Sequence, residues 1–227
     1  AWPRSGAPMH IHPPKEAIRS LRHFSLELFT VTCGILIALS LEGLVESMHH
    51  RSLVKHARGT LQAECGENRK RLRTITDAIP GELKELEKLI RVCRKELAQR
   101  GSTDNGADAT FRLSYSAGPL TTTAWSAAGS SGALARMDYE ELRSFTRVYV
   151  TQEFVGSLQQ QALSRWLQLQ RLSLLLPGED SRMKDLTPEE LVDLKRNAIE
   201  AHAVTTSLKN CSEDLIAEYD QLLAGKR

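Results

Sequence analysis

The sequence predicts an all-α protein in which one transmembrane helix continues into a bundle of about four long helices. Three observations support this fold class. Apolar residues recur at three- and four-residue steps along most of the chain, which is the pattern of helices with one buried face. Charged residues make up 26% and aromatic residues only 5%, a balance that suits helices better than a β-sandwich. One uncharged apolar stretch lies near the N-terminus.

The chain of 227 residues is long enough for one soluble domain plus an anchor. A net charge of +2 gives no strongly basic surface, so we expect no nucleic-acid partner. We divide the chain into a proline-rich tail (1–19), a transmembrane helix (20–48), a helical hairpin (49–100), a loop region rich in Gly, Ser, Thr and Ala (101–135), and two long helices that complete the bundle (136–227).

The predicted anchor centres on residues 28–41, LFTVTCGILIALSL, which carry no charge. Flanking apolar residues extend it to 24–45, a helix of about 33 Å, enough to cross the hydrocarbon layer. Basic side chains flank the stretch as interfacial anchors would: Arg22, His23, His49, His50 and Arg51. The alternative is a cleaved signal peptide, since Ala-Leu-Ser at 38–40 is a tolerable cleavage motif.

Small residues and two carboxylates share one face of the anchor. At 100° per residue, an arc of about 120° holds Glu27, Thr30, Gly34, Ala38 and Glu42. Small residues let another helix approach closely, and intramembrane carboxylates face protein or water. We expect this small-residue stripe to pack against other membrane protein subunits. The alternatives are self-association into a homo-oligomer, and snorkelling of both glutamates to the membrane interfaces.

The first soluble segment continues the anchor helix, because no proline occurs between Lys15 and Ile79. Its apolar seam is Val54, Ala57, Leu61, Cys65, Asn68, Leu72, Ile75 and Ile79. Pro80-Gly81 is expected to end this helix, and a second seam (Leu83, Leu86, Ile90, Cys93, Leu97) to fold back as an antiparallel hairpin. That hairpin would permit a Cys65–Cys93 disulfide; the alternative is ordinary buried thiols.

The second half predicts a short helix at 122–128 that buries Trp125, and a long helix from Asp138 as N-cap to Leu176. The last helix begins with Thr187 as N-cap in a capping box with Glu190 and ends at Gly225. A coiled-coil-like seam repeats every seven residues at Leu194, Ala201, Leu208, Leu215 and Leu222.

A search for chemistry finds no GxSxG, phosphate loop, HExxH or Rossmann motif. His49 and His56 are seven residues apart on one helix face, a spacing at which they could ligate a metal or a tetrapyrrole. The alternative is interfacial anchoring beside Arg51 and Lys55. Since no third ligand is indicated, we expect no metal, no cofactor and no catalytic residue, and hence no enzyme.

Several segments together resemble a group of uncharacterised bacterial single-pass membrane proteins. They are HFSLELFTVT at 23–32, GILIAL at 34–39, His49-His50-Arg51, Glu64 with Asn68-Arg69, Trp125, Gly132-Ala133-Leu134 and Met137-Asp138-Tyr139. The group has an FxVTxGxLIALxL-like anchor followed by a twin His and an ExxxN element. The resemblance covers about half the chain and implies topology and a helical soluble domain, but no activity. Cys65 and Gly66 inside the ExxxN element depart from the pattern.

We therefore expect a non-catalytic accessory or scaffold subunit that stabilises a larger complex, such as an energy-transducing one, in a bacterial inner membrane. The alternative is a membrane-tethered ligand-binding sensory domain. Four basic residues before the anchor against three after it favour a cytoplasmic N-terminus and a periplasmic domain. The tail at 1–14, with four prolines, has no core of its own, so we expect partner subunits to hold it.

Overall fold

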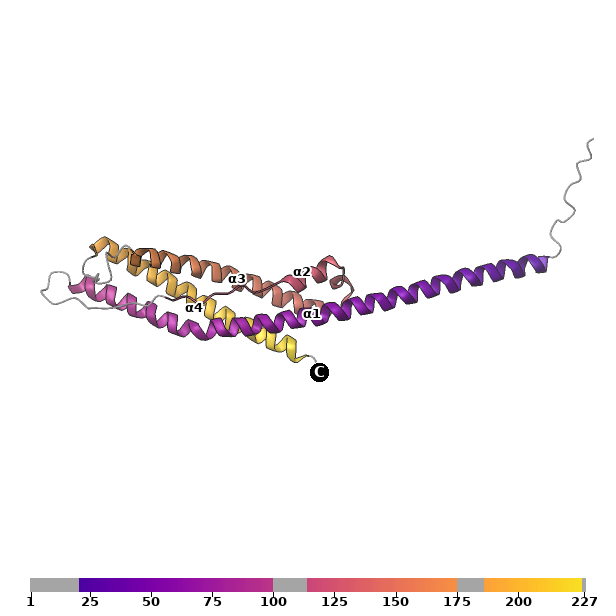
Figure 1. Cartoon of the computed structure of the whole chain (residues 1–227), viewed down its shortest axis with the longest axis horizontal. Coiled ribbons are helices and arrows are strands. Elements are labelled where there is room, and N and C mark those ends of the chain that lie inside the picture. The colour runs from indigo at the N-terminus through magenta and orange to yellow at the C-terminus, as the bar shows by residue number, and fades with distance from the viewer. Residues whose placement is uncertain (1–20, 100–113, 175–185, 226–227) are drawn as a thin grey trace, which may run out of the picture. The chain divides into compact units, whose positions relative to one another are not determined.

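The computed structural model describes residues 21–99, 114–174 and 186–225, and these residues are all-α, as predicted. The helices are α1 (Leu21–Gln99), α2 (Thr123–Ser130), α3 (Tyr139–Leu174) and α4 (Pro188–Ala224), with a short 3-10 helix, η1 (Leu134–Arg136), between α2 and α3 (Figure 1). Four α-helices are present in this part of the chain, but only three are long. The predicted tail (1–19) and the predicted end of α3 at Leu176 lie outside the described residues.

The chain divides into two compact units, Ala1–Ser52 and Leu53–Arg227. The described part of the first unit is the N-terminal part of α1. Among the described residues, it holds the one segment that is long and apolar enough, by length and composition, to cross a membrane, and no residue of its most apolar window is buried. The hydroxyls of Thr30, Thr32 and Ser40 donate to carbonyls one turn earlier, at 2.9, 2.7 and 2.6 Å. These polar groups are therefore satisfied inside the helix, as an apolar environment requires.

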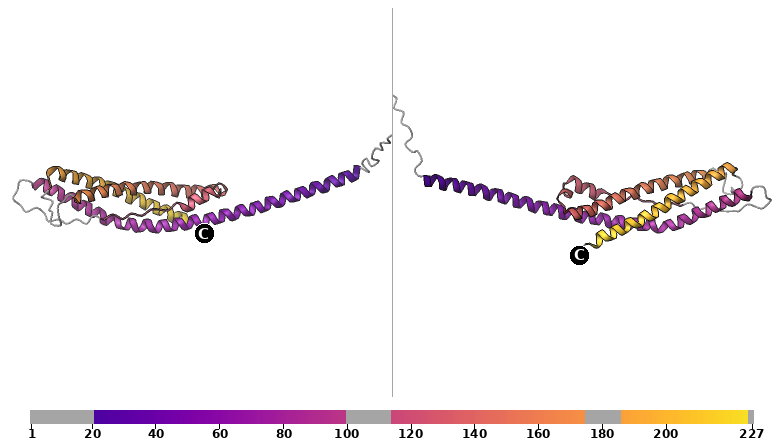
Figure 2. Two further views of the ribbon diagram at one scale, coloured as in Figure 1. Left: turned by 45° about the horizontal axis from the view of Figure 1, so that its top comes forward. Right: turned by 180° about the vertical axis from the view of Figure 1, so that it is seen from behind.

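The second unit is built on two clusters of buried side chains. The first cluster joins residues of α1, α3 and α4, including Leu61, Leu72, Phe145, Leu208 and Leu215. The second, farther along α1, includes Leu86, Leu89, Trp166, Leu169 and Leu194. Figure 2 shows α3 and α4 side by side in both views. They run antiparallel, since Arg147 pairs with Glu218 at one end and Arg165 with Glu200 at 2.8 Å toward the other.

The predicted hairpin at 49–100 is wrong, because α1 continues through Pro80 without a break. Pro80 and Gly81 are exposed, so the proline ring displaces nothing in the core. The buried face also keeps its phase across them: Ile75 and Ile79 are followed by Glu82, Leu86 and Leu89, in steps of four and three. Packing on both sides of Pro80 therefore holds one helix despite the lost hydrogen bond.

The Cys65–Cys93 disulfide that the hairpin would permit does not form. All four cysteines are free thiols, and Cys65 and Cys93 are both buried in α1. They are 28 residues apart in one helix, or about 42 Å at 1.5 Å per residue. A disulfide needs Cα atoms within about 7 Å. The other reading, that of buried thiols, describes these two residues.

Three predicted helix termini are confirmed: the starts of α3 and α4 and the end of α4. Asp138 Oδ1 accepts from the main-chain N–H of Glu140 at 3.0 Å, as an N-cap does. Thr187 and Glu190 form the predicted capping box, with Pro188 in the first turn, and Gly225 follows the end of α4. In the seven-residue seam of α4, the residues from Leu194 to Leu215 are buried and Leu222 is half-buried.

Candidate functional site

The described part of the predicted loop region is held firmly against the long helices. Residues 114–122 contain no helix, and α2 follows them directly. Along this segment the partners on α1 run backwards, from Glu82 at Ser116 to Asn68 at Thr121 and Glu64 at Ala124. The segment 114–122 therefore runs antiparallel to α1. Polar side chains of α1 accept these hydrogen bonds from the main chain of the segment.

Asn68 holds Thr121 by both of its main-chain groups. Its Oδ1 accepts from the Thr121 N–H at 2.9 Å, and its Nδ2 donates to the Thr121 carbonyl at 2.7 Å. The Thr121 hydroxyl donates to the same Oδ1 at 3.2 Å. The side-chain amide thus pairs with Thr121 as a neighbouring peptide group would. Asn68 is fully buried, so water cannot replace these bonds.

Gln152 of α3 links this contact to the third long helix. Its Nε2 donates to the Thr121 carbonyl at 3.0 Å, and its Oε1 accepts from Asn68 Nδ2 at 3.1 Å. The hydroxyl of Tyr219, on α4, also donates to Gln152 Oε1. One connected polar network, Asn68–Thr121–Gln152–Tyr219, therefore joins α1, the segment 114–122, α3 and α4. A fully satisfied buried network of this kind specifies a single arrangement of the elements it joins.

Glu64, one turn before Asn68, holds the start of α2. Its Oε2 accepts from the Ala124 N–H at 2.9 Å, in the first turn of that helix. Its Oε1 accepts from the Tyr149 hydroxyl at 2.7 Å. The Trp125 and Tyr149 rings stack with centroids 4.7 Å apart. Burial, together with the charge of Glu64, raises the pKa of Tyr149 and keeps its hydroxyl protonated as a donor.

Glu82 holds the other end of the segment. Its Oε1 accepts from the Ser116 N–H at 2.6 Å, while its Oε2 is buried without a hydrogen-bond partner. Only 4% of the residue is exposed, and burial raises the pKa of its carboxyl. Nearby, Tyr115 stacks on Trp166 at 5.9 Å and donates its hydroxyl to the Gln159 carbonyl at 2.9 Å.

The raised pKa of Glu82 leads to a pH-dependent prediction. The folded state binds this proton more tightly than the unfolded state does. The resulting stability is complete below the unfolded pKa and is lost as pH rises through the higher folded pKa. Glu82→Gln keeps an oxygen for the Ser116 N–H and removes the buried charge. We expect the stability of Glu82→Gln relative to the wild type to increase as pH rises from 4 to 7.5. The quantity compared is the free energy of unfolding, measured by urea denaturation. A difference that does not change with pH would contradict this.

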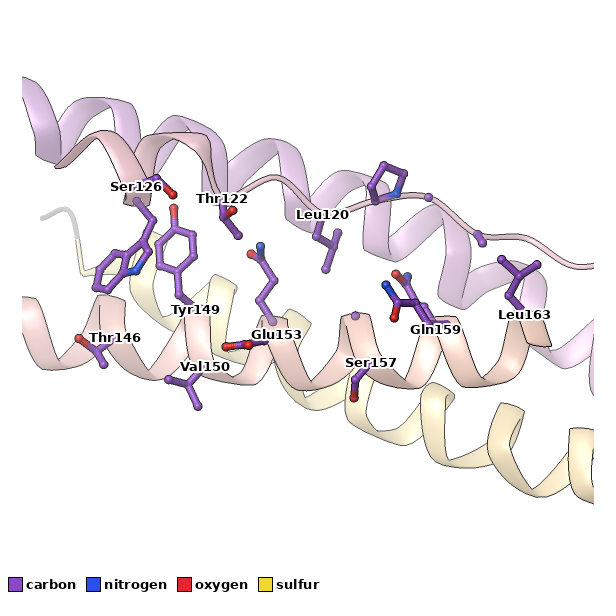
Figure 3. A pocket seen from close by; sticks show the side chains of 17 residues that line it. Leu120, Thr122, Ser126, Thr146, Tyr149, Val150, Glu153, Ser157, Gln159 and Leu163 are labelled. Atoms are coloured by element: carbon purple, nitrogen blue, oxygen red, sulfur yellow. The ribbon is translucent and has the colours of Figure 1, made fainter. Parts of the chain in front are cut away.

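A groove of about 870 Å³ lies between the segment 114–122, α2 and α3. Figure 3 shows Leu120 and Thr122 on one side and the side chains of α3 on the other, with Tyr149 between them. Glu153 is the one charged residue that lines it. Gln159 also lines it; 8% of this residue is exposed, and its Nε2 is buried without a partner.

Reactive chemistry at the described residues would depend on the pKa values of the buried thiols and on the grouping of His, Cys, Asp and Glu side chains. Burial raises the pKa of both Cys65 and Cys93 to about 11, so neither is a thiolate nucleophile at neutral pH. In the described ranges, no group of three or more His, Cys, Asp or Glu side chains is arranged to hold a metal ion. What these residues do best is hold helices and the segment 114–122 in one arrangement.

The site residues predicted from the sequence all lie on α1. The stripe residues Glu27, Thr30, Gly34, Ala38 and Glu42 are exposed in the single chain, and a Cβ added at Gly34 would meet nothing within 4 Å. Of the predicted interfacial anchors, His23, His49 and Arg51 are exposed, and His50 Nε2 lies 3.6 Å from Glu46. The side chain of Arg22 lies outside the described residues. Packing of the stripe and interfacial anchoring stay predictions.

The sequence reasoning missed most of the polar network. It placed Asn68 on the buried seam and Glu64 in the ExxxN element, but it gave neither a partner. Thr121, Gln152, Tyr219 and Glu82 were not singled out. One signal was available: an asparagine in an otherwise apolar seam needs buried hydrogen-bond partners. Comparison of the chain with models of known protein families, with curated proteins and with solved structures finds no match.

Proposed function

We propose that this chain is a non-catalytic accessory subunit, anchored by α1 in a bacterial inner membrane, that stabilises a larger membrane complex. One observation carries the proposal. No residue in the apolar window of α1 is buried, and the same helix continues without a break into the buried seam of the second unit. A large exposed apolar surface needs an apolar surrounding, which a bilayer or neighbouring membrane helices provide.

The second unit supports a structural role over a chemical one. Its buried polar groups are used to fix the segment 114–122, through Asn68, Glu64 and Glu82. These hydrogen bonds give an irregular segment one fixed position, which suits a protein that presents a rigid binding surface. By the charge balance around the anchor, we propose that this unit is periplasmic.

The stripe of α1 is where we propose the anchor meets its partner helix. Gly34→Ile is expected to lower co-extraction of the chain with its complex in mild detergent by roughly tenfold, the effect of about 1.4 kcal/mol of lost helix packing. The second unit should keep its thermal unfolding midpoint, because Gly34 lies in the first unit. Blue native electrophoresis of the extracts, with quantitative blotting, measures the co-extracted fraction.

The matched control is Gly43→Ile. Gly43 is nine residues from Gly34, half a turn away in angle and so on the opposite face of the helix. A Cβ added there also meets nothing within 4 Å. Equal effects of both variants would remove the stripe from the proposal. A wild-type chain that comes out of the membrane alone or as a homodimer would favour the sensory domain instead.

A further inference from the structure

The groove beside the polar network contains unused hydrogen-bonding groups on both of its walls. On one wall, the main-chain groups of Ala117, Gly118 and Leu120 make no hydrogen bond with the described residues. On the α3 wall, the amide nitrogen of Gln159 is buried and has no hydrogen-bond partner among the described residues. A buried amide donor without an acceptor is costly, so an acceptor that reached it from the groove would be stabilising.

The dimensions of the groove suit an extended peptide. Its lining runs along α3 from Thr146 to Leu163, about 26 Å at 1.5 Å per residue. About eight residues of extended chain cover that length at 3.3 Å per residue. Gly156 lies midway along this wall, and a Cβ there would meet nothing within 4 Å, so the wall leaves room for a second main chain.

The charge of the groove selects one side chain of the peptide. Glu153 is its one charged lining residue, is exposed, and makes no ion pair with another described residue. It follows Tyr149 by one helical turn, and Tyr149 stacks on Trp125, which also lines the groove. A carboxylate next to an aromatic face binds a cation by both charge and ring quadrupole.

We propose that this groove binds an extended peptide segment of a partner protein, with a lysine or arginine of that segment beside Glu153. The main chain of the peptide pairs with the unused groups of Ala117, Gly118 and Leu120, and a peptide carbonyl accepts from Gln159. This deepens the accessory-subunit proposal, on which it rests, by naming the chemistry of the partner. Recognition by main-chain pairing along an extended segment with one anchored side chain is a general mode of peptide binding.

The test is a phage-displayed library of random octapeptides selected on the full-length chain in nanodiscs, followed by anisotropy measurements with the enriched synthetic peptide. We expect enriched peptides to share a Lys or Arg. Glu153→Gln should weaken their binding about tenfold, and Gly156→Leu should abolish it. N-methylation of alternate amides of the peptide should weaken binding, because only every second amide of an extended chain faces the partner strand.

Two controls match these variants. Gly66→Leu also fills an open position in a helix of the second unit, and Asp214→Asn removes an exposed charge; neither residue lines the groove. Both should bind like the wild type. If circular dichroism shows that Gly156→Leu does not fold, Ser157→Lys takes its place in the test. Ser157 is exposed on the same wall, and a lysine there should repel the basic peptide.

A library without enrichment, or binding that neither Glu153→Gln nor the wall variants change, overturns the proposal. So does enrichment of peptides with apolar residues three and four apart, since these would bind as helices. The accessory function is judged separately. Loss of co-extraction with Gly34→Ile, alongside a failed selection, keeps the accessory role and removes the groove from it.

Discussion

Replacing Asn68 by alanine is expected to lower the unfolding free energy of the second unit by about 3 kcal/mol. The substitution removes four hydrogen bonds and leaves the N–H of half-buried Thr121 without its acceptor. Each buried group left unpaired costs about 1–3 kcal/mol. For a unit of this size the melting temperature should fall by about 6–12 °C, measured by circular dichroism at 222 nm.

The same variant should release the segment 114–122 locally. Hydrogen exchange of the Thr121 amide is expected to become faster than in the wild type by more than the change in global stability accounts for. Asn197→Ala is the matched control, since the Asn197 amide donates only to the Asp193 carbonyl within α4. That variant should stay within about 0.5 kcal/mol of the wild type. If Asn68→Ala melts like Asn197→Ala, the network does not hold the segment.

The parts of the fold that local sequence determines were predicted correctly. The Thr187 capping box and the Asp138 N-cap depend on side chains within three residues of the main-chain groups they bind. The seam of α4 depends on helical periodicity alone, and its positions from Leu194 to Leu215 are buried. Information of this kind is contained in short windows of sequence, so one sequence without relatives is enough to read it.

The polar network could not be read in this way. Asn68 and Thr121 are 53 residues apart, and Gln152 and Tyr219 are 67 apart. Thr121 lies in a stretch whose composition indicates only turns and loops. No local pattern states which polar side chain will meet which main-chain group across such distances. The sequence shows that Asn68 needs a partner, and only the packing of the three long helices supplies it.

The hairpin prediction was wrong for a different reason. It gave one local break signal more weight than the apolar pattern that runs through it. Pro80-Gly81 is a strong break signal. Yet the predicted second seam, Leu83, Leu86 and Ile90, follows Ile79 in steps of four, three and four, so the apolar face never changes phase. A true turn would have no reason to preserve that phase. The free energy of burying a continuous face exceeds the cost of one proline.

Pro80→Ala is therefore expected to stabilise the protein. A proline inside a helix costs about 3 kcal/mol relative to alanine, and Pro80 is exposed, so its removal loses no core packing. Alanine restores the N–H that can donate to the Thr76 carbonyl. Without the proline ring, the unfolded chain of the variant has more conformational entropy, which reduces this gain by about 0.4–1 kcal/mol.

The net increase in unfolding free energy should be about 2 kcal/mol, or a melting temperature higher by about 4–8 °C. Gly81→Ala provides the neighbouring comparison. Gly81 is exposed, an added Cβ meets nothing within 4 Å, and the gain expected from helix propensity alone is about 1 kcal/mol. The two variants together test whether residues 79–82 are helical in solution. If Pro80 instead began a turn between two helices, Pro80→Ala would lower the melting temperature, and α1 would have to end at Ile79.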